Sequence, residues 1–257
     1  MSSRYTFSMS TINYMNSRIQ TQRFTNNSMT DNTINQKVKI LFRNKDFLVV
    51  DKPYDIRIDG DTSKAPTVSS LLYAQDPTLP TPLRNVHQLD HATSGCYCLA
   101  LSKKAAGIAS VAFANHFKCD LTAAKTKLEV IRRGYFYPTS PSSLPSESPI
   151  KVTLINLYPI TGRRHQLRLH CQYLGHPIVG DWHYESQIME YTDTFRMMLH
   201  ACKLRIPLNI IQGVKMRNAE NTNENVKNDD LEDLHELDVG SEDPFPGLVY
   251  ECVKDET

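Results

Sequence analysis

Runs of hydrophobic residues predict a series of short strands along the middle of the chain. Two runs rich in β-branched and aromatic residues, 38–42 and 47–50, flank the polar residues 43–46, a pattern that predicts a hairpin. Residues 96–101 are almost all apolar, as in a strand that is buried on both faces. Further strands are expected at 86–89, 127–132, 151–157 and 196–206.

Three stretches have the spacing of helices with one apolar face. Ser102 can cap a helix that runs to about His116, and a shorter helix is expected at 67–73. A third helix is expected at 165–174, where Gly175 can end it. Strands and helices follow one another without a regular βαβ rhythm. The sequence therefore predicts an α+β fold with a mixed, largely antiparallel sheet.

The chain divides into a leader, a body and a tail. Its 257 residues fit one compact domain with extensions, and we place that domain at 37–210. Residues 1–36 are rich in Ser, Thr and Asn and are expected to form a disordered or leader segment. Their composition fits disorder better than a mitochondrial presequence. Residues 211–257 are expected to form an acidic, mostly disordered tail.

The formal net charge of +1 hides an asymmetry between body and tail. Up to Asn218 the chain has 27 Lys and Arg against 15 Asp and Glu, a net charge of +12; beyond it the counts are 2 and 13, a net charge of −11. A basic body is typical of proteins that bind a phosphate backbone, although surplus lysines also serve solubility alone. No run of 18 apolar residues occurs, so we expect no membrane partner.

The cysteines and histidines favour neither disulfides nor a metal site. The six cysteines form no Cys-x-x-Cys pair, and several fall within apolar runs, as reduced buried thiols do. We therefore expect a cytoplasmic or other reducing intracellular compartment, with mitochondria as the weaker alternative. His165 and His170 are five residues apart and would lie on different faces of a helix, so no metal site is expected.

Two polar segments carry the candidate chemistry. The segment HQLDHATSG at 87–95 places Asp90 at the end of a short strand. The segment TGRRHQLRLH at 161–170 places Arg164 and Arg168 four residues apart on a helix, away from its apolar face. A guanidinium beside a carboxylate favours the ionised acid, and the turn before the helix suits an anion. The pair predicts an enzyme with one working carboxylate; the plainer hypothesis is a solvated basic face.

Both segments resemble signature motifs of the RluA-type RNA pseudouridine synthases. HQLDHATSG is similar to the family's HRLDxxTSG, and residues 161–184, TGRRHQLRLHCQYLGHPIVGDWHY, are similar to its TGRTHQIRVHxxxxGHPIxGDxxY. Residues 195–201, FRMMLHA, resemble a third motif, a strand that contains Leu-His-Ala. The resemblance extends from about Ile40 to Pro207 and is greatest to the animal RNA pseudouridylate synthase domain-containing proteins.

The resemblance implies a pseudouridine-synthase-like sheet flanked by helices, with a central cleft. Asp90 matches the catalytic aspartate and Arg168 the arginine that pairs with it, while Leu199 would pack under the flipped base. The substrate would be tRNA, rRNA or mRNA, with no obligate protein partner evident. A carboxylate suffices for the reaction, so no metal or organic cofactor is expected. The other positions implied to bind substrate are His87, Gln88, Leu89, Thr93, Arg163, Arg164, His165, Gln166 and His200.

Two departures from the family's motifs bear on activity. Gln88 stands where the family usually has arginine. Between Phe117 and Ala124 the chain lacks the family's strand Lys-x-Tyr-x-Ala, whose tyrosine stacks on the target base, and this indicates an internal deletion near 118–124. A missing internal strand would leave its neighbours with unpaired backbone groups. Two functions stay open: a synthase that isomerises uridine through Asp90, or a catalytically impaired RNA-binding paralogue or incomplete isoform without the tyrosine strand.

Overall fold

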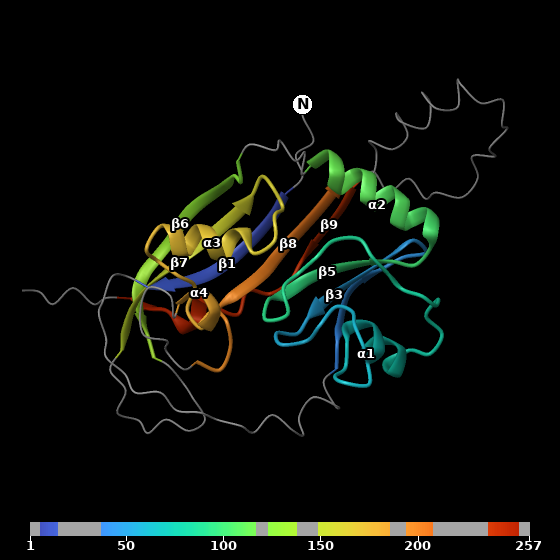
Figure 1. Ribbon diagram of the computed structural model, residues 1–257, viewed down its shortest axis with the longest axis horizontal. Helices are drawn as coiled ribbons and strands as arrows, with labels where there is room; N and C mark the ends of the chain where they lie inside the picture. Colours follow the sequence, from blue (N-terminus) through green and yellow to red (C-terminus); the bar gives the residue numbers. More distant parts are fainter. Residues whose placement is uncertain are drawn as a thin grey trace, which may run out of the picture.

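Strands from distant parts of the chain join in one sheet (Figure 1). The computed structural model describes residues 6–14, 37–116, 123–137, 149–185, 194–207 and 236–251. The strands are β1 (Thr6–Tyr14), β2 (Lys39–Arg43), β3 (Phe47–Lys52), β4 (Arg84–Asn85), β5 (Ser94–Ala100), β6 (Thr126–Phe136), β7 (Ile150–Pro159), β8 (Leu199–Pro207), β9 (Glu236–Gly240) and β10 (Tyr250–Glu251). The helices are α1 (Val68–Gln75), α2 (Lys103–His116), α3 (Gln166–Tyr173) and α4 (Trp182–Glu185), with a 3₁₀ turn η1 (Pro246–Leu248).

The sheet runs in the order β10-β6-β7-β1-β8-β5-β3-β2, with β4 beside β5 and β9 beside β8. Its strands pair antiparallel except β5 and β8, which run parallel. α3 and α4 lie on the half that contains β6, β7 and β1, whereas α1 and α2 lie on the half that contains β3 and β5 (Figure 1). The predicted fold class is confirmed. Among the described helices, none is long and apolar enough to cross a membrane.

Three groups of buried side chains form the core, and they divide between the two halves of the sheet. One group contains Ile12, Leu154 and Cys171 and joins β1, β7 and α3. A second packs α2 against β5, with Ala105 and Ala109 on the buried face that the sequence predicted for this helix. A third packs α1 against β3 and β5. The two halves therefore have separate cores, and the central strands connect them.

Local hydrogen bonds explain where several elements begin. The side-chain oxygen of Asn44 closes the turn between β2 and β3 by accepting from the N–H groups of Asp46 and Phe47 at 2.9 and 2.7 Å. Ser102 caps α2 by accepting from the N–H of Ala105 at 3.0 Å. The predicted hairpin and the predicted helix cap are both confirmed.

Residues 6–14 correct the expectation that 1–36 form a disordered or leader segment. They form β1, which pairs antiparallel with β7 on one side and β8 on the other. Ile12 is buried in the core, and Asn13 donates from Nδ2 to the carbonyl oxygen of His176 at 2.6 Å. The Ser and Thr content of this strand resembles that of a disordered segment, whereas its backbone is satisfied by two neighbouring strands. The remaining residues of the segment lie outside the described ranges.

An internal deletion near 118–124 was expected to leave sheet neighbours with unpaired backbone groups. Residues 117–122, which overlap the expected deletion at 118–124, lie outside the described part of the chain. The sheet nevertheless continues from β7 through β1 to β8. β1, from the N-terminal segment, pairs with both β7 and β8.

Part of the acidic tail is built into the sheet, which corrects the expectation of disorder for those residues of 211–257. β9 pairs with β8, and β10 pairs with β6. A carboxylate oxygen of Asp238 lies 2.6 Å from Arg205 Nη2, and the other lies 3.2 Å from Lys203 Nζ. Glu236 lies 3.2 Å from Arg205 Nε. Acidic residues of the tail thus neutralise positive charge on β8.

Candidate active site

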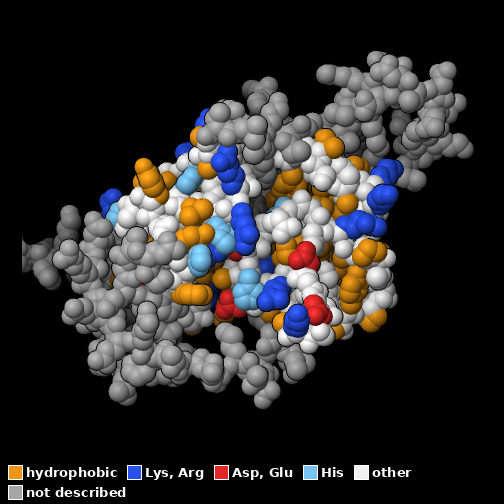
Figure 2. Space-filling view, viewed as in Figure 1, with side chains coloured by type: hydrophobic (Ala, Val, Ile, Leu, Met, Phe, Trp, Pro, Cys, Tyr) orange, Lys and Arg blue, Asp and Glu red, His pale blue; other side chains and the backbone are white. Residues whose placement is uncertain are grey.

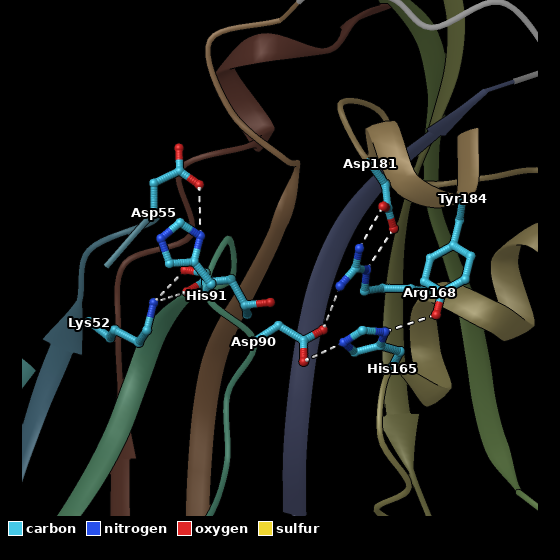
Figure 3. A network of polar contacts seen from close by, with 9 residues as sticks. Lys52, Asp55, Asp90, His91, His165, Arg168, Asp181 and Tyr184 are labelled. Atoms are coloured by element: carbon cyan, nitrogen blue, oxygen red, sulfur yellow. Dashed lines mark hydrogen bonds and ion pairs between the residues drawn. The ribbon is translucent and has the colours of Figure 1, made fainter. Parts of the chain in front are cut away.

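The turn that carries Asp90 is fixed by Lys52, the last residue of β3 (Figure 3). Lys52 is fully buried, and its Nζ donates to the carbonyl oxygens of Pro53, His91 and Thr93 at 2.9, 2.8 and 2.7 Å. The N–H of Thr93 in turn donates to the carbonyl oxygen of Asp90 at 3.1 Å. An ammonium has three hydrogens to donate, and here all three have acceptors. The carbonyl of Asp90 and those of His91 and Thr93, which follow it, are therefore all held by hydrogen bonds.

Burial makes the charge of Lys52 costly and lowers its pKa to about 7. The negative charges of Asp55 and Asp90 act in the opposite direction. A neutral amine has only two hydrogens, so it cannot serve three carbonyl acceptors. The contact with the turn is complete only when Lys52 is protonated.

Behind this turn, β5 approaches β8 too closely for a side chain at position 95. Gly95 has a φ of +106°, and a Cβ atom there would lie 2.3 Å from the carbonyl oxygen of Ala201. The Ser94 hydroxyl joins the same two strands: it lies 2.8 Å from Nδ1 of His200 and accepts from Arg196. The Thr-Ser-Gly part of the first motif therefore sets the spacing of these strands.

Arg168, in the first turn of α3, connects Asp90 to a second carboxylate. Its Nη1 donates to Asp90 Oδ2 at 3.1 Å, and its Nε and Nη2 donate to the two oxygens of Asp181 at 2.7 Å each. The guanidinium carbon lies 4.9 Å from the ring centroid of Tyr184. Burial acts to lower the pKa of Arg168, but the hydrogen bonds and charges of Asp181 and Asp90 outweigh it and raise the pKa. The cation beside Asp90 is thus permanent and fixed in orientation.

His165 lies on the other side of the same carboxylate. It precedes α3 in a left-handed conformation, with φ 53°, which is uncommon for a residue with a side chain. Its Nε2 lies 3.6 Å from Asp90 Oδ1, and its Nδ1 lies 2.8 Å from the hydroxyl of Tyr184. Burial lowers the pKa of His165, helped by Arg168 and Arg164 and opposed by Asp90. Asp90 therefore faces a cation at one oxygen and an imidazole at the other.

Several other predicted substrate-binding residues lie at the surface near Asp90. Gln88 is exposed, and the half-buried Leu89 packs against core groups of both halves. Arg163 and Arg164 are exposed on the turn before α3. Figure 2 shows a hollow between the two halves of the surface, where Lys, Arg and His side chains gather together with a few acidic ones. The positive charges suit a polyanion, and contact of these residues with substrate stays a prediction.

The predicted residues His87 and His200 are engaged in the packing around β5. The Nε2 of His87 accepts from the N–H of Cys98 at 2.9 Å, and its ring stacks on Phe113 at a centroid distance of 5.2 Å. His200 is almost fully buried, with its Nδ1 beside the hydroxyl of Ser94. Burial lowers the pKa of each histidine to about 4. These contacts hold both rings in place, and contact of either ring with substrate stays a prediction.

Gln166, Leu199 and Thr93 also have interior positions. The side-chain oxygen of Gln166 accepts from the Thr161 hydroxyl at 2.6 Å and from the N–H of Arg163 at 3.2 Å, which shapes the turn before α3. Leu199 belongs to the core group beneath α3, and Thr93 is 1% exposed. Of the predicted substrate-binding residues, His165 is the one whose ring nitrogen the structure places against the Asp90 carboxylate, among the described contacts.

Three members of this network were not predicted from the sequence: Lys52, Asp181 and Tyr184. Asp181 and Tyr184 belong to the second motif, but nothing in a linear pattern shows that they reach back to Arg168 and His165. Lys52 offered no signal beyond a charged residue at the end of an apolar strand. Its partners are backbone carbonyls, which every residue type provides.

Comparisons with known proteins show the family to which the chain is related. A model of the family described as RNA pseudouridylate synthase matches residues 46–120, which include Asp90. The chain is similar to RNA pseudouridylate synthase domain-containing protein 1 of Bos taurus, with 35% identity over 206 residues that cover 65% of this chain and 67% of the relative. The Mus musculus protein of the same name is 35% identical over 210 residues, which cover 67% of this chain and 69% of the relative.

Two more distant comparisons extend the likeness. Ribosomal large subunit pseudouridine synthase C of Pasteurella multocida is 30% identical over 206 residues, which cover 68% of this chain and 62% of that protein. The solved structure titled Human RNA Pseudouridylate Synthase Domain Containing 1 superposes with a TM-score of 0.53 at 28% identity and covers 88% of this chain and 94% of that chain. Both the sequence and the fold are therefore shared with these proteins.

Proposed function

Because the chain belongs to the RNA pseudouridylate synthase family, we propose that it isomerises uridine to pseudouridine in RNA and that Asp90 is its catalytic carboxylate. Synthesis of pseudouridine is the activity of this family. One observation carries the assignment of Asp90: its carboxylate lies 3.1 Å from the guanidinium of Arg168, which Asp181 holds in a bidentate pair. An ionised and oriented carboxylate is what this reaction needs.

The reaction breaks the N-glycosidic bond of uridine, turns the base and joins its C5 atom to the ribose C1′. As an anion, Asp90 either attacks C1′ or assists the formation of a glycal. Arg168 binds one oxygen of the carboxylate, while the other oxygen faces His165. A uridine must leave its stack to reach this carboxylate, as in other enzymes that act on a base.

RNA is the substrate class that follows, and the Lys and Arg side chains at the hollow in Figure 2 support it. Arg163 and Arg164 are exposed on the turn before α3 and would contact phosphates of tRNA, rRNA or mRNA. We also propose a reducing intracellular compartment. The cysteines of the described part of the chain, Cys96, Cys98, Cys171 and Cys202, are free thiols, which supports this placement.

The proposal is tested with RNA that contains [5-³H]uridine, because the C5 hydrogen is released once C5 has bonded to C1′. We expect tritium release by the wild-type protein and a rate at least about 1000-fold lower for Asp90→Asn. Asp90→Asn keeps the size of the side chain, so RNA affinity should stay within about twofold. Undiminished release by Asp90→Asn would exclude this role. No release by the wild type, with salt-sensitive RNA binding intact, would instead identify a catalytically impaired RNA-binding paralogue.

A further inference from the structure

Pseudouridine formation needs a proton acceptor in addition to the carboxylate. When C5 bonds to C1′, C5 still carries its original hydrogen. That C5–H bond must break: its electrons form the C5=C6 double bond, the C6=N1 pair moves onto N1, and N1 takes a proton from solvent. The net change is one hydrogen moved from C5 to N1. The group that accepts the C5 proton has to lie close to the atom that Asp90 attacks.

Asp90 has a histidine on each side, and the two rings are oriented differently (Figure 3). The ring of His91 is turned toward Asp55, with its Nδ1 3.8 Å from the carboxylate, and the side chain is 54% exposed. The ring of His165 faces Asp90 itself, with Nε2 3.6 Å from Oδ1 and a side-chain exposure of 23%. His165 is therefore the histidine whose ring faces the reacting carboxylate.

The contact with Tyr184 is linked to the tautomer of His165, because a hydroxyl either accepts from Nδ1–H or donates to the Nδ1 lone pair. Its Nδ1 lies 2.8 Å from the Tyr184 hydroxyl oxygen. When the Nδ1–H donates to this oxygen, the lone pair of the neutral ring is on Nε2. An ionised carboxylate has no hydrogen to donate, so Asp90, whose Oδ1 lies 3.6 Å from Nε2, does not occupy this lone pair.

The charges around His165 favour a neutral ring before reaction. Burial lowers its pKa below the usual 6.5, and the nearby Arg168 and Arg164 lower it further, while Asp90 and Asp181 act in the opposite direction. A neutral imidazole accepts a proton readily near pH 7. The resulting imidazolium would lie next to the Asp90 carboxylate, which stabilises it.

We propose that His165 accepts the C5 proton through Nε2 and that Tyr184 is a positioning residue that holds its tautomer. This inference rests on the proposed function, since it concerns a step of the same reaction. The left-handed backbone of His165 is consistent with this role, because strain of this kind persists where surrounding contacts hold a side chain in a required position. His165 loses the proton to solvent at the end of each turnover.

The experiment compares His165→Gly, His165→Gln and the matched control His91→Gln in the tritium-release assay. Glycine suits the left-handed backbone and leaves room for added imidazole. We expect release to fall at least about 100-fold in both His165 variants and to stay within about twofold in His91→Gln. Added imidazole should restore part of the rate of His165→Gly. Tyr184→Phe should lower the rate about tenfold, because the ring stays in place but its tautomer is no longer set.

A kinetic isotope effect distinguishes proton transfer from a general loss of structure. With RNA that carries 5-deuterouridine, His165→Gln should show an effect of about threefold or more, because C5–H cleavage becomes rate-limiting. Wild-type release rates in the His165 variants would overturn this inference alone, as would an equal loss in His91→Gln or a slow His165→Gln without an isotope effect. No release by the wild type would overturn the proposed function, and this step with it.

Discussion

Asp90 lies between two regions of the molecule that are held by different means. On the side of β3 and β5, the restraints act on the backbone: Lys52 binds main-chain carbonyls, and Gly95 lies against the backbone of Ala201. On the side of α3, the restraints join side chains, as in the pair of Arg168 with Asp181. The first region fixes where the carboxylate is, and the second fixes which charges it faces.

This difference has a consequence for substitution. A region held through its backbone depends on shape and hydrogen-bond geometry, so its tolerance of a new residue is decided by space and by conformation. A region held by side-chain pairs depends on charge, so replacing one partner leaves the other as an uncompensated ion. Catalysis needs both regions, because a carboxylate can react only when its position and its charged surroundings are both fixed.

The largest effect is expected from Gly95→Ala in the backbone-held region. The new Cβ would lie 2.3 Å from a backbone oxygen at a φ of +106°, so β5 and β8 must separate. We expect the free energy of unfolding to fall by about 4 kcal/mol, measured by urea denaturation. The matched control is Gly60→Ala, where φ is +127° but nothing lies within 4 Å of the new atom. A similar loss in both variants would show that conformation, and not close approach, accounts for the effect.

Asp181→Asn is expected to have the next largest effect and acts in the region held by side chains. It removes the bidentate partner of Arg168, whose side chain is only 11% exposed. We expect a loss of about 3 kcal/mol in unfolding free energy together with slower tritium release, since the cation is left with Asp90 alone. Asp238→Asn, which breaks surface pairs to Lys203 and Arg205, serves as control and should change stability little. Equal effects would contradict the importance of burial.

The contact between Asp90 and Arg168 could be predicted because it depends on the types of the two residues. The pairing of Asp90 with Arg168, proposed from two motifs, is seen at 3.1 Å. The hairpin and the cap of α2 were predictable for the same reason, since each depends on residues a few positions apart. These features need no knowledge of distant partners.

The features that were missed depend on contacts between distant segments. β1 is a strand because β7 and β8 flank it, and its Ser and Thr residues gave no sign of this. Lys52 donates to carbonyl oxygens about forty residues further along the chain. Because every residue has a backbone carbonyl, the sequence does not indicate which ones Lys52 binds. The ring contacts of His87 with Phe113 and of His200 with Phe245 likewise join residues far apart in the chain.

Lys52→Met tests directly whether the hydrogen bonds from Lys52 hold the turn that carries Asp90. Methionine keeps the length of the side chain but donates nothing to the carbonyls of His91 and Thr93. We expect tritium release to slow about 30-fold, which corresponds to about 2 kcal/mol in the activation barrier. The amide hydrogen of Thr93, which bonds to the carbonyl oxygen of Asp90, should exchange with solvent faster than in the wild type, because the turn opens more often. The exposed Lys64→Met is the control, and unchanged exchange at Thr93 in Lys52→Met would show that the turn is stable without the hydrogen bonds from Lys52.

The smallest effect expected is a pH dependence of stability that comes from Lys52. Its pKa in the folded protein is about 7, against 10.5 as its ordinary value, so between these values the unfolded chain binds the extra proton. Stability should therefore rise with pH in this window, and below pH 7 the full cost of burying the charge remains.

Subtracting the unfolding free energy of Lys52→Met at each pH removes the contribution of other groups. The wild type should gain about 1 kcal/mol relative to the variant between about pH 7 and about pH 8. A difference that stays constant from about pH 6 to about pH 9 would mean that the three carbonyl acceptors keep Lys52 charged throughout. Hydrogen bonding would then outweigh burial at this residue, and the backbone-held region would, like its counterpart at α3, contain a permanent cation.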